Sequence, residues 1–156
     1  MRAVIQRVNG ASVAVDGEVV GSFTGPGLVA LVGINVDDDQ SMCATLADKI
    51  WKMRIFDRDA LTAQGFTVRS ENREVAACDA HLPILVISQF TLYADTSRGR
   101  RPTWQQAARG DVAEPLINDV IRSLRDLGAH VEKGRFGADM KITQTCDGPV
   151  TMCLEI

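Results

Sequence analysis

Apolar and polar residues alternate along the first thirty-five positions, and short turn signals divide the alternation into four segments. Alternation with a period of two is typical of strands that bury one face. Asn9-Gly10 and Asp16-Gly17 supply the positive φ angles that tight hairpin turns require. The pattern therefore predicts an antiparallel meander of four strands, over residues 2–8, 11–15, 18–23 and 28–34.

Two later segments place apolar side chains at intervals of three or four, which is typical of amphipathic helices. Residues 37–53 begin with three aspartates, and an aspartate at that point offers an N-cap. In the second segment Asp111 and Glu114 have capping-box spacing, and Pro115 fits a first turn. Gly128 suits the left-handed position that follows a helix end. The spacing predicts one helix in each segment.

One further strand and several loops complete the prediction. The run from Leu82 to Tyr93 is almost continuously apolar and rich in β-branched residues, which favours a buried strand. Residues 57–81 show no clear period and predict a loop with one short strand. The other expected elements are an arginine-rich loop at 95–102, a short helix around Trp104, and strands near Val131, at 140–145 and at 150–156.

The order of these elements indicates an α+β fold, with a mostly antiparallel sheet and two to three helices packed on one face. A doubly wound fold would alternate strands and helices and would carry a glycine-rich turn after the first strand, and the sequence shows neither feature. The chain has 156 residues, of which 46% are hydrophobic, so a core can form without disulfides or metal. We expect residues 1–156 to form a single domain.

Composition narrows the possible functions. The formal net charge is −3, which argues against diffuse capture of nucleic acid and leaves only local contact. The four cysteines form no Cys-x-x-Cys pair, so we expect reduced, buried thiols and no metal site. The sequence shows no signal peptide and no apolar stretch of membrane-spanning length, so we expect a cytoplasmic protein without a membrane partner.

Small hydroxyl side chains lie at the end of the predicted buried strand. Ser88 and Thr91 are candidate nucleophiles if a base lies within hydrogen-bond reach, but neither of the two histidines stands in a pattern that supplies one. The alternatives are that these hydroxyls position a substrate or satisfy nearby backbone groups. Gln89 is expected to cap a strand edge or to position a ligand, and Phe90 is expected in the core.

Two short segments carry a resemblance to a known family. They are Ser88-Gln89-Phe90-Thr91-Leu92 and Gly148-Pro149-Val150-Thr151. Flanking similarity covers most of the chain and includes Ile5-Gln6-Arg7-Val8, Arg54-Ile55-Phe56, Arg101-Pro102 and Gly134-Arg135-Phe136. With both segments in this order, the chain resembles the D-aminoacyl-tRNA deacylase family. Cys146 departs from the asparagine that is usual there, and residues 59–80 are longer than in compact members.

The resemblance implies an activity and an assembly. Members of that family have a barrel-like α+β fold and hydrolyse the ester that joins a D-amino acid to the terminal adenosine of tRNA. Carried over, the resemblance implies a homodimer in which Gly148 and Pro149, joined by a cis peptide bond and held by Arg7, reach into the pocket of the other subunit. Main-chain oxygens there would collide with an L side chain and leave room for a D side chain. Glycyl-tRNA would also be accepted as a substrate, because glycine has no side chain to collide.

The resemblance also implies site residues and the absence of a cofactor. Thr91 and Phe90 would supply backbone N–H groups that stabilise an oxyanion, and Ser88 and Gln89 would contact the substrate. The 2′-hydroxyl of the tRNA would assist, without a metal ion and without a covalent acyl-enzyme. Two other functions stay open from the sequence: an esterase with Thr91 as nucleophile, and a dimeric RNA-binding module without catalysis.

Basic residues in two places are candidates for contact with tRNA: the loop after the predicted buried strand, and the segment after the second predicted helix. They are Arg98, Arg100, Arg101, Lys133 and Arg135. The three arginines stand within four positions, which is typical either of a solvated surface or of a phosphate clamp. Phe136 is expected either in the core or beside the terminal adenine.

Overall fold

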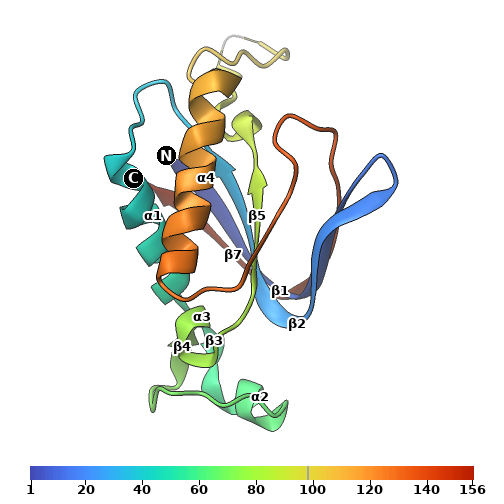
Figure 1. Cartoon of the computed structure of the whole chain (residues 1–156), viewed down its shortest axis with the longest axis vertical. Helices are drawn as coiled ribbons and strands as arrows, with labels where there is room; N and C mark the ends of the chain where they lie inside the picture. The colour runs from blue at the N-terminus through green and yellow to red at the C-terminus, as the bar shows by residue number, and fades with distance from the viewer. Residues whose placement is uncertain (98) are drawn as a thin grey trace.

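The computed structural model describes residues 1–97 and 99–156. Figure 1 shows a curved sheet, two long helices on one side of it, and a group of short elements at one end. In chain order the elements are β1 (Arg2–Val15), β2 (Glu18–Gly33), α1 (Ser41–Lys52), β3 (Arg54–Asp57), α2 (Arg58–Ala63), β4 (Glu74–Ala76), α3 (Ala77–Ala80), β5 (Ile84–Ser88), the 3-10 helix η1 (Phe90–Tyr93), α4 (Gly110–Asp126), β6 (Val131–Lys133) and β7 (Lys141–Glu155).

A five-stranded sheet in the order β6-β5-β2-β1-β7 forms the centre of this α+β fold. β1 pairs antiparallel with β2 and β7, whereas β5 pairs parallel with β2 and β6. The prediction of a mostly antiparallel sheet is therefore wrong for the half around β5. A parallel pair needs a long crossover, which α1 and the short elements after it provide between β2 and β5. Local turn signals do not encode such a pairing.

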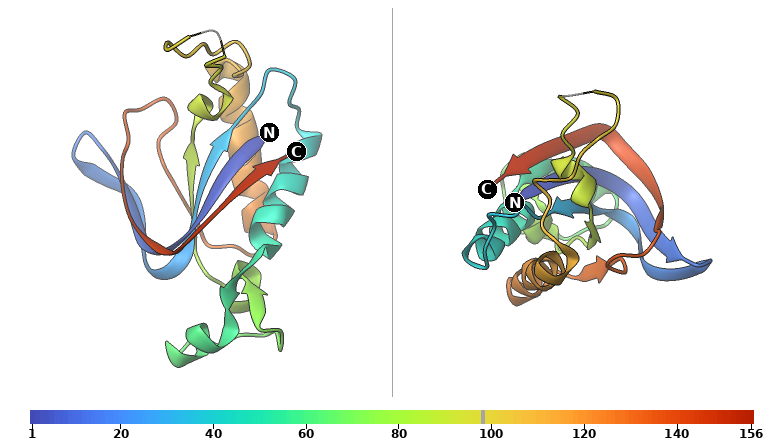
Figure 2. Two further views of the ribbon diagram at one scale, coloured as in Figure 1. Left: turned by 180° about the vertical axis from the view of Figure 1, so that it is seen from behind. Right: turned by 90° about the horizontal axis from the view of Figure 1, so that it is seen from above.

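The barrel-like character that the resemblance implies is not confirmed. Among the described residues, β6 and β7 stand at the two ends of the strand order, so the sheet is open. Figure 2 shows that the sheet is nevertheless strongly curved, with the hairpin of β1 and β2 bending away from the helices. The described residues form four α-helices rather than two or three, because α2 and α3 are short helices within the segment that the sequence predicts as a loop.

Apolar side chains are buried on both faces of the sheet. On one face, Ala30 and Val86 belong to the main core with residues of α1 and α4, which pack against each other (Figure 2). On the other face, Val29 and Leu85 belong to a second cluster that includes Val13 from the curved end of β1. Both faces of β5 are therefore covered, which confirms a buried strand in the run from Leu82, although the strand ends at Ser88.

The two Asx-Gly dipeptides of the first hairpin adopt different structures. Asp16 and Gly17 have φ angles of 53° and 84° and form the expected turn. Asn9-Gly10 is not a turn, because β1 continues through it with a register shift between Asn9 and Ala11. The φ of 88° at Gly10 accommodates this β-bulge. The four predicted strands are therefore two long ones, β1 and β2.

The ends of the long helices differ from the sequence prediction at their N-termini. Neither Gln40 before α1 nor Arg109 before α4 makes a side-chain cap, so the predicted capping box at residues 111–114 is wrong. Pro115 lies inside α4 rather than in its first turn. The C-terminal prediction is confirmed, because Gly128 has a φ of 91° and its N–H bonds to the carbonyl of Arg125 at 2.9 Å.

Several other elements of the structure, between and after these helices, differ from the sequence prediction. Residues 57–81 contain β4, as the one short strand expected there, together with α2 and α3. No helix forms around Trp104; instead Asp95 and Thr103 form an isolated antiparallel bridge that closes the loop between them. The two strands predicted at 140–145 and 150–156 are one continuous strand, β7. No helix in the described part of the chain is long and apolar enough to cross a membrane.

The expectation of buried thiols holds for one cysteine only. Cys43 is buried, Cys78 is half-buried, and Cys146 and Cys153 are exposed on β7; all four are free thiols. Burial raises the pKa of the Cys43 thiol to about 11. At pH 8, roughly one molecule in a thousand therefore carries Cys43 as the reactive thiolate.

We expect iodoacetamide at pH 8 to modify Cys43 in the folded protein at least 100-fold more slowly than it modifies an unhindered thiol. Peptide mass spectrometry after timed quenching measures each site separately. Urea-unfolded protein is the control, and Cys43 should react there at an ordinary rate. Rapid labelling of Cys43 in the folded protein would contradict its buried, protonated state.

Candidate functional site

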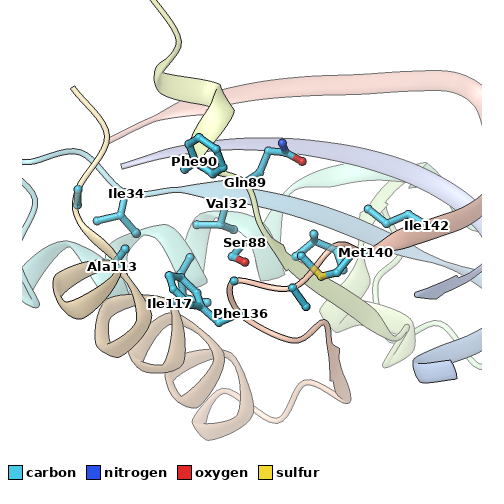
Figure 3. Close-up of a pocket in the computed structure, with 15 residues that line it drawn as sticks. Val32, Ile34, Ser88, Gln89, Phe90, Ala113, Ile117, Phe136, Met140 and Ile142 are labelled. Carbon is cyan, nitrogen blue, oxygen red and sulfur yellow. The ribbon is translucent and has the colours of Figure 1, made fainter. Parts of the chain in front are cut away.

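A cavity lies where β5 ends, and we call it the main cavity because a smaller one adjoins it. Its volume is about 380 Å³, which is in the range of small-molecule sites. In Figure 3, Ser88 and Gln89 from the end of β5 lie across from Ala113 and Ile117 of α4, with Phe136 and Met140 completing the wall. The full lining is Val32, Ile34, Ile87, Ser88, Gln89, Phe90, Ala108, Gly110, Ala113, Ile117, Phe136, Gly137, Ala138, Met140 and Ile142.

Strand pairing fixes Ser88 and Gln89 at this wall. Ser88 is the last residue of β5 and stands opposite Val32 of β2. The N–H of Gln89 donates to the carbonyl of Val32 at 2.7 Å, and the chain then leaves the sheet as η1. Ser88 and Gln89 are therefore half-buried at a strand end whose geometry the sheet determines.

The 3-10 helix η1 is anchored from beneath by Tyr93 and Arg2. Tyr93 is buried, and burial raises the pKa of its phenol to about 12, so it stays neutral. The Arg2 guanidinium lies 4.6 Å from the centre of the Tyr93 ring and donates to the carbonyl of Leu92 at 3.1 Å. These contacts hold the last two residues of η1 in place, and Phe90 and Thr91 are the first two residues of the same short helix.

Thr91 lies beside the cavity but does not line it. Its hydroxyl oxygen accepts a hydrogen bond from the side-chain amide of Gln89, and the residue is exposed. An amide nitrogen cannot accept a proton, so this contact does not activate a nucleophile. His130 is hydrogen-bonded to Glu132, and His81 lies against Trp51, so both described histidines are engaged elsewhere.

The backbone N–H groups of Phe90 and Thr91 begin η1. The first N–H groups of a helical turn have no acceptor within the turn. Among the described residues, neither group donates to a backbone or side-chain acceptor. Both donors are therefore free for a ligand.

Phe90 is not a core residue, and this prediction is wrong. Its side chain is 57% exposed, and its ring centre lies 5.1 Å from that of Trp104, with the ring planes at 70°. The wrong prediction has a physical cause: the sheet ends at Ser88, so Phe90 projects beyond the core instead of continuing an alternating strand. Phe136, by contrast, is half-buried and packs on the core while also lining the cavity.

Gly33 contributes to this site although no sequence pattern identifies it. A Cβ at Gly33 would lie 2.9 Å from the carbonyl oxygen of Gln89, 3.1 Å from Cβ of Leu92 and 3.3 Å from the Tyr93 ring. β2 and η1 can therefore approach closely only because position 33 has no side chain. A side chain there would displace the turn that carries Phe90.

Gly148 and Pro149 lie on β7, and the peptide bond between them is cis. Pro149 lacks an N–H, and β7 is an edge strand, the position where a proline is tolerated in a sheet. Arg7 holds this segment through Asp147: its Nε lies 2.9 Å from a carboxylate oxygen and donates to the Asp147 carbonyl at 3.3 Å. Its Nη1 donates to the carbonyl of Ile55 at 2.5 Å.

Within one chain, Gly148 and Pro149 do not reach the cavity. Across the sheet, Ser88 aligns through β2 and β1 with Leu154 of β7. Gly148 and Pro149 lie five to six residues before Leu154 on β7, and neither belongs to the described lining of the cavity. The only β7 residue in the described lining is Ile142. One chain therefore does not bring the two signature segments together.

Cys146, where the family usually has asparagine, sits between two glutamine side chains. Gln144 donates to Gln6 at 2.7 Å and lies 3.4 Å from the sulfur of Cys146. The buried Oε1 of Gln144 has no partner among the described atoms. A thiol is a weak donor and a weak acceptor, so Cys146 gives neither glutamine a strong hydrogen bond.

The basic candidates fall into two groups. Arg100 and Arg101 are exposed on the loop that the Asp95–Thr103 bridge closes, and Arg98 lies outside the described residues. The N–H of Ser97 donates to Asp95 and lowers the pKa of that carboxyl group, which therefore remains charged at neutral pH.

Lys133 and Arg135 belong to the second group. They line a smaller cavity of about 290 Å³, which shares Ser88, Ile117 and Phe136 with the main one. In the described part of the chain, no group of three or more histidine, cysteine, aspartate or glutamate side chains is arranged to hold a metal ion.

Comparison with known proteins places this chain in a family. The model of the D-Tyr-tRNA(Tyr) deacylase family matches residues 4–155. A D-aminoacyl-tRNA deacylase from Streptomyces coelicolor is 51% identical over 156 residues, which is 100% of each chain. A D-aminoacyl-tRNA deacylase from Nocardia farcinica is 51% identical over 157 residues, which is 99% of each chain.

Solved structures agree on the fold. A structure described as c-Myc DNA unwinding element binding protein has a TM-score of 0.85 at 32% identity and covers 100% of this chain and 99% of its own. A probable eukaryotic D-amino acid tRNA deacylase has a TM-score of 0.82 at 15% identity, covers 99% and 98%, and shows the fold alone. With a family model over nearly the whole chain and full-length relatives of about half identity, this chain belongs to the D-Tyr-tRNA(Tyr) deacylase family.

Proposed function

We propose that this chain hydrolyses the ester bond of D-aminoacyl-tRNA and releases the D-amino acid and free tRNA, with residues 1–156 acting as one domain of a homodimer. The observation that carries the proposal is the cavity of about 380 Å³ at the end of β5, with Ser88 and Gln89 in its wall. A cavity of this size suits one aminoacyl-adenosine end rather than a folded partner. Charged tRNA is a cytoplasmic substrate, so the proposal assigns the activity to the cytoplasm.

The homodimer is supported by the exposure of β7. This edge strand is fifteen residues long, and its apolar residues Ile142 and Met152 are 37% and 41% exposed. Long apolar edge strands are seldom left open, because their free N–H and C=O groups pair with other chains. In the proposed dimer, Gly148 and Pro149 of one subunit face the cavity of the other. The separation of the two signature segments within one chain is then resolved by the partner.

In this proposal the enzyme distinguishes D from L substrates by steric exclusion of the L side chain. Inverting the configuration at Cα exchanges the positions of hydrogen and side chain relative to a fixed amino group and ester. The carbonyl oxygens of Gly148 and Pro149 of the partner subunit stand where an L side chain would lie and leave a D side chain free. Glycine has no side chain to exclude, so glycyl-tRNA mischarged on alanine tRNA is a second proposed substrate.

Catalysis in this proposal depends on positioning and on backbone donors. The free N–H groups of Phe90 and Thr91 stabilise the oxyanion that forms when water attacks the ester, and one such donor contributes about 3–4 kcal/mol. Ser88 and Gln89 orient the aminoacyl group, and the 2′-hydroxyl of the terminal ribose assists. Holding ester and water in line contributes further, up to about 7–11 kcal/mol in ideal cases. The mechanism requires no metal ion and no acyl-enzyme.

Contact with the tRNA phosphates is assigned to the two basic groups. Arg100 and Arg101 are exposed on the loop between η1 and Trp104, and Lys133 and Arg135 line the adjoining cavity. Guanidinium groups bind phosphate in a bidentate manner, so this local charge suffices on a chain whose net charge is −3. Arg98 belongs to the same loop in sequence and to the same proposal.

The proposal is tested with purified protein and matched D- and L-tyrosyl-tRNA, with and without a chelator. We expect rapid loss of the D ester, slow loss of the L ester, and no effect of the chelator. Equal loss of both esters would defeat exclusion of L substrates, and chelator sensitivity would defeat the metal-free mechanism. Binding of tRNA with both esters intact after hours would instead support a non-catalytic RNA-binding module.

Thr91→Ala is expected to retain more than a tenth of the wild-type kcat on D-tyrosyl-tRNA. The hydroxyl contacts only the Gln89 amide, and the proposed catalytic group of Thr91 is its backbone N–H, which alanine keeps. Quenched-flow hydrolysis of the radiolabelled ester measures the effect. If Thr91 is instead a nucleophile, turnover should fall more than 1000-fold and the wild type should yield an acyl adduct by mass spectrometry.

Gly33→Ala is expected to lower kcat about tenfold. The new Cβ would lie 2.9 Å from the Gln89 carbonyl oxygen, a backbone atom that can move only with η1. The donors of Phe90 and Thr91 then lose their alignment with the oxyanion. Gly27→Ala is the matched control, because its Cβ would lie 2.8 Å from the carbonyl oxygen of Pro83, which precedes β5 and lines neither cavity. Both variants should lose about 1–3 kcal/mol of stability, and only Gly33→Ala should lose kcat.

A further inference from the structure

Two large aromatic side chains lie exposed in contact with each other beside the main cavity. Phe90 is 57% and Trp104 is 40% exposed, and their ring centres are 5.1 Å apart in an edge-to-face arrangement. Phe90 also belongs to the lining of the cavity, so the pair reaches from the cavity wall to the outer surface (Figure 3 shows Phe90). Exposed aromatic surface that adjoins a cavity usually marks a binding surface.

Backbone contacts hold this aromatic pair in place. Asp95 and Thr103 exchange two backbone hydrogen bonds of 3.0 and 2.9 Å immediately before Trp104. The N–H of Ala107 donates to the Trp104 carbonyl at 3.1 Å, and Ala107 itself bridges to Asn35 after β2. Trp104 is therefore fixed against Phe90 by the closed base of its loop. A rigid aromatic face loses little entropy when a ligand stacks on it.

The charges around the pair indicate the kind of ligand. Arg100 and Arg101 lie on the loop closed by the Asp95–Thr103 bridge, and both are exposed without an ion pair among the described residues. Aromatic faces next to unpaired guanidinium groups are the combination that binds single-stranded nucleic acid, because bases stack on the rings and phosphates pair with the cations. Aromatic and arginine side chains are also enriched at protein–protein interfaces, so a second copy of this chain is the competing occupant. The pair is continuous with the cavity that receives the terminal adenosine in the proposed function, and this continuity favours the RNA end.

We propose that Phe90 and Trp104 form a stacking platform for the penultimate base of the tRNA 3′ end, with its phosphate directed towards Arg100 and Arg101. This inference rests on the proposed function, since the terminal adenosine ester must occupy the cavity. The acceptor end of tRNA is single-stranded, so the nucleotide before the adenosine leaves the cavity unpaired and meets the exposed rings. The platform binds the RNA and takes no part in ester cleavage.

The kinetic test compares two substrates on Trp104→Ala and Trp104→Phe. D-tyrosyl-tRNA contains the penultimate nucleotide, whereas D-tyrosyl-adenosine ends at the ester-bearing nucleoside. We expect Trp104→Ala to raise KM for D-tyrosyl-tRNA about tenfold, as the loss of one base stack predicts. D-tyrosyl-adenosine should show no corresponding rise, and Trp104→Phe should restore most of the tRNA affinity because phenylalanine keeps an aromatic face.

Two results would overturn the platform. One is an unchanged KM for D-tyrosyl-tRNA in Trp104→Ala, and the other is an equal loss on both substrates, which indicates a structural role. Size-exclusion chromatography tests whether a second copy of the chain occupies this surface instead. If the wild type is a dimer and the Trp104→Ala variant is a monomer, the surface belongs to the dimer interface. Failure of the wild type to hydrolyse either substrate would count against the proposed function instead.

A binding measurement is independent of activity. Titration of the wild type with the trinucleotide CpCpA should quench tryptophan fluorescence, because Trp104 is exposed while the only other tryptophan, Trp51, is buried. A trinucleotide with an abasic second position should quench several-fold less at the same concentration. Trp104→Phe should lose the CpCpA-dependent quench. Equal quenching by both trinucleotides would contradict stacking of the penultimate base.

Discussion

Gly148→Ala is expected to lower kcat/KM on D-tyrosyl-tRNA by at least 100-fold while the protein stays folded. Gly148 has a φ of 122°, a conformation that residues with a Cβ rarely adopt. A Cβ there would also lie 2.9 Å from Cγ2 of Val150, 3.0 Å from the Val150 nitrogen and 3.0 Å from Nη2 of Arg7. The backbone of the segment must therefore shift, and the carbonyl oxygens proposed to exclude L side chains shift with it.

The loss should appear in the reaction more than in stability. Gly148 lies on an exposed edge strand, so local rearrangement of β7 leaves the two apolar clusters intact. Single-turnover rates with D- and L-tyrosyl-tRNA should show a reduced D-to-L ratio, and thermal unfolding should show only a modest shift. A 100-fold loss corresponds to about 2.7 kcal/mol of transition-state stabilisation.

Gly17→Ala is the matched control for positive φ. Gly17 has a φ of 84° in the hairpin turn, and a Cβ there would meet nothing within 4 Å. This variant should lose about 1 kcal/mol of stability through backbone strain and should keep full activity. If Gly148→Ala behaves in the same way as Gly17→Ala, the Gly148 carbonyl has no part in selecting the substrate.

The parts of the fold that could be predicted are those with a local physical cause. Asp16-Gly17 is a turn because both residues adopt positive φ in a two-residue hairpin, and Gly128 ends α4 for the same conformational reason. The run after Leu82 is a buried strand because both faces of β5 are covered. In each case the residues that produce the signal also make the contact.

The wrong predictions have causes that lie elsewhere in the chain. Asn9-Gly10 carries the same local signal as Asp16-Gly17, but pairing of β1 with both β2 and β7 keeps it inside one strand as a bulge. The parallel pairing of β5 depends on the crossover from β2, which no dipeptide encodes. The prediction that Phe90 lies in the core requires β5 to continue past Ser88, but β5 ends there.

The candidate site shows the same division. Ser88 and Gln89 could be found from a strand end followed by small polar side chains, and the structure brings them to the cavity wall. Gly33 could not be found, because its importance comes from how closely η1 approaches β2. Gly148 and Pro149 could be singled out only by resemblance, since one chain keeps them away from the cavity.

Arg7→Lys is expected to lower kcat/KM on D-tyrosyl-tRNA by roughly 10- to 50-fold, although lysine keeps the charge. The guanidinium of Arg7 contacts Asp147 through Nε and the Ile55 carbonyl through Nη1 at the same time. A lysine ammonium is a point donor on a flexible stem and cannot make this planar set of contacts. Loss of the set releases the backbone immediately before Gly148, so the proposed exclusion surface loses its fixed position.

Steady-state kinetics and urea unfolding of Arg7→Lys, Asp147→Asn and the double variant apportion the effect. The Arg7 side chain is 19% exposed, so a stability loss of about 1–2 kcal/mol is expected when the Ile55 carbonyl loses its donor. Arg122→Lys is the control, because Arg122 is 61% exposed where it pairs with Asp119 of α4, and this variant should change neither quantity appreciably. If Arg7→Lys and Asp147→Asn add independently in activity, the contact between them does not position Gly148, because residues that act through one contact show non-additive effects.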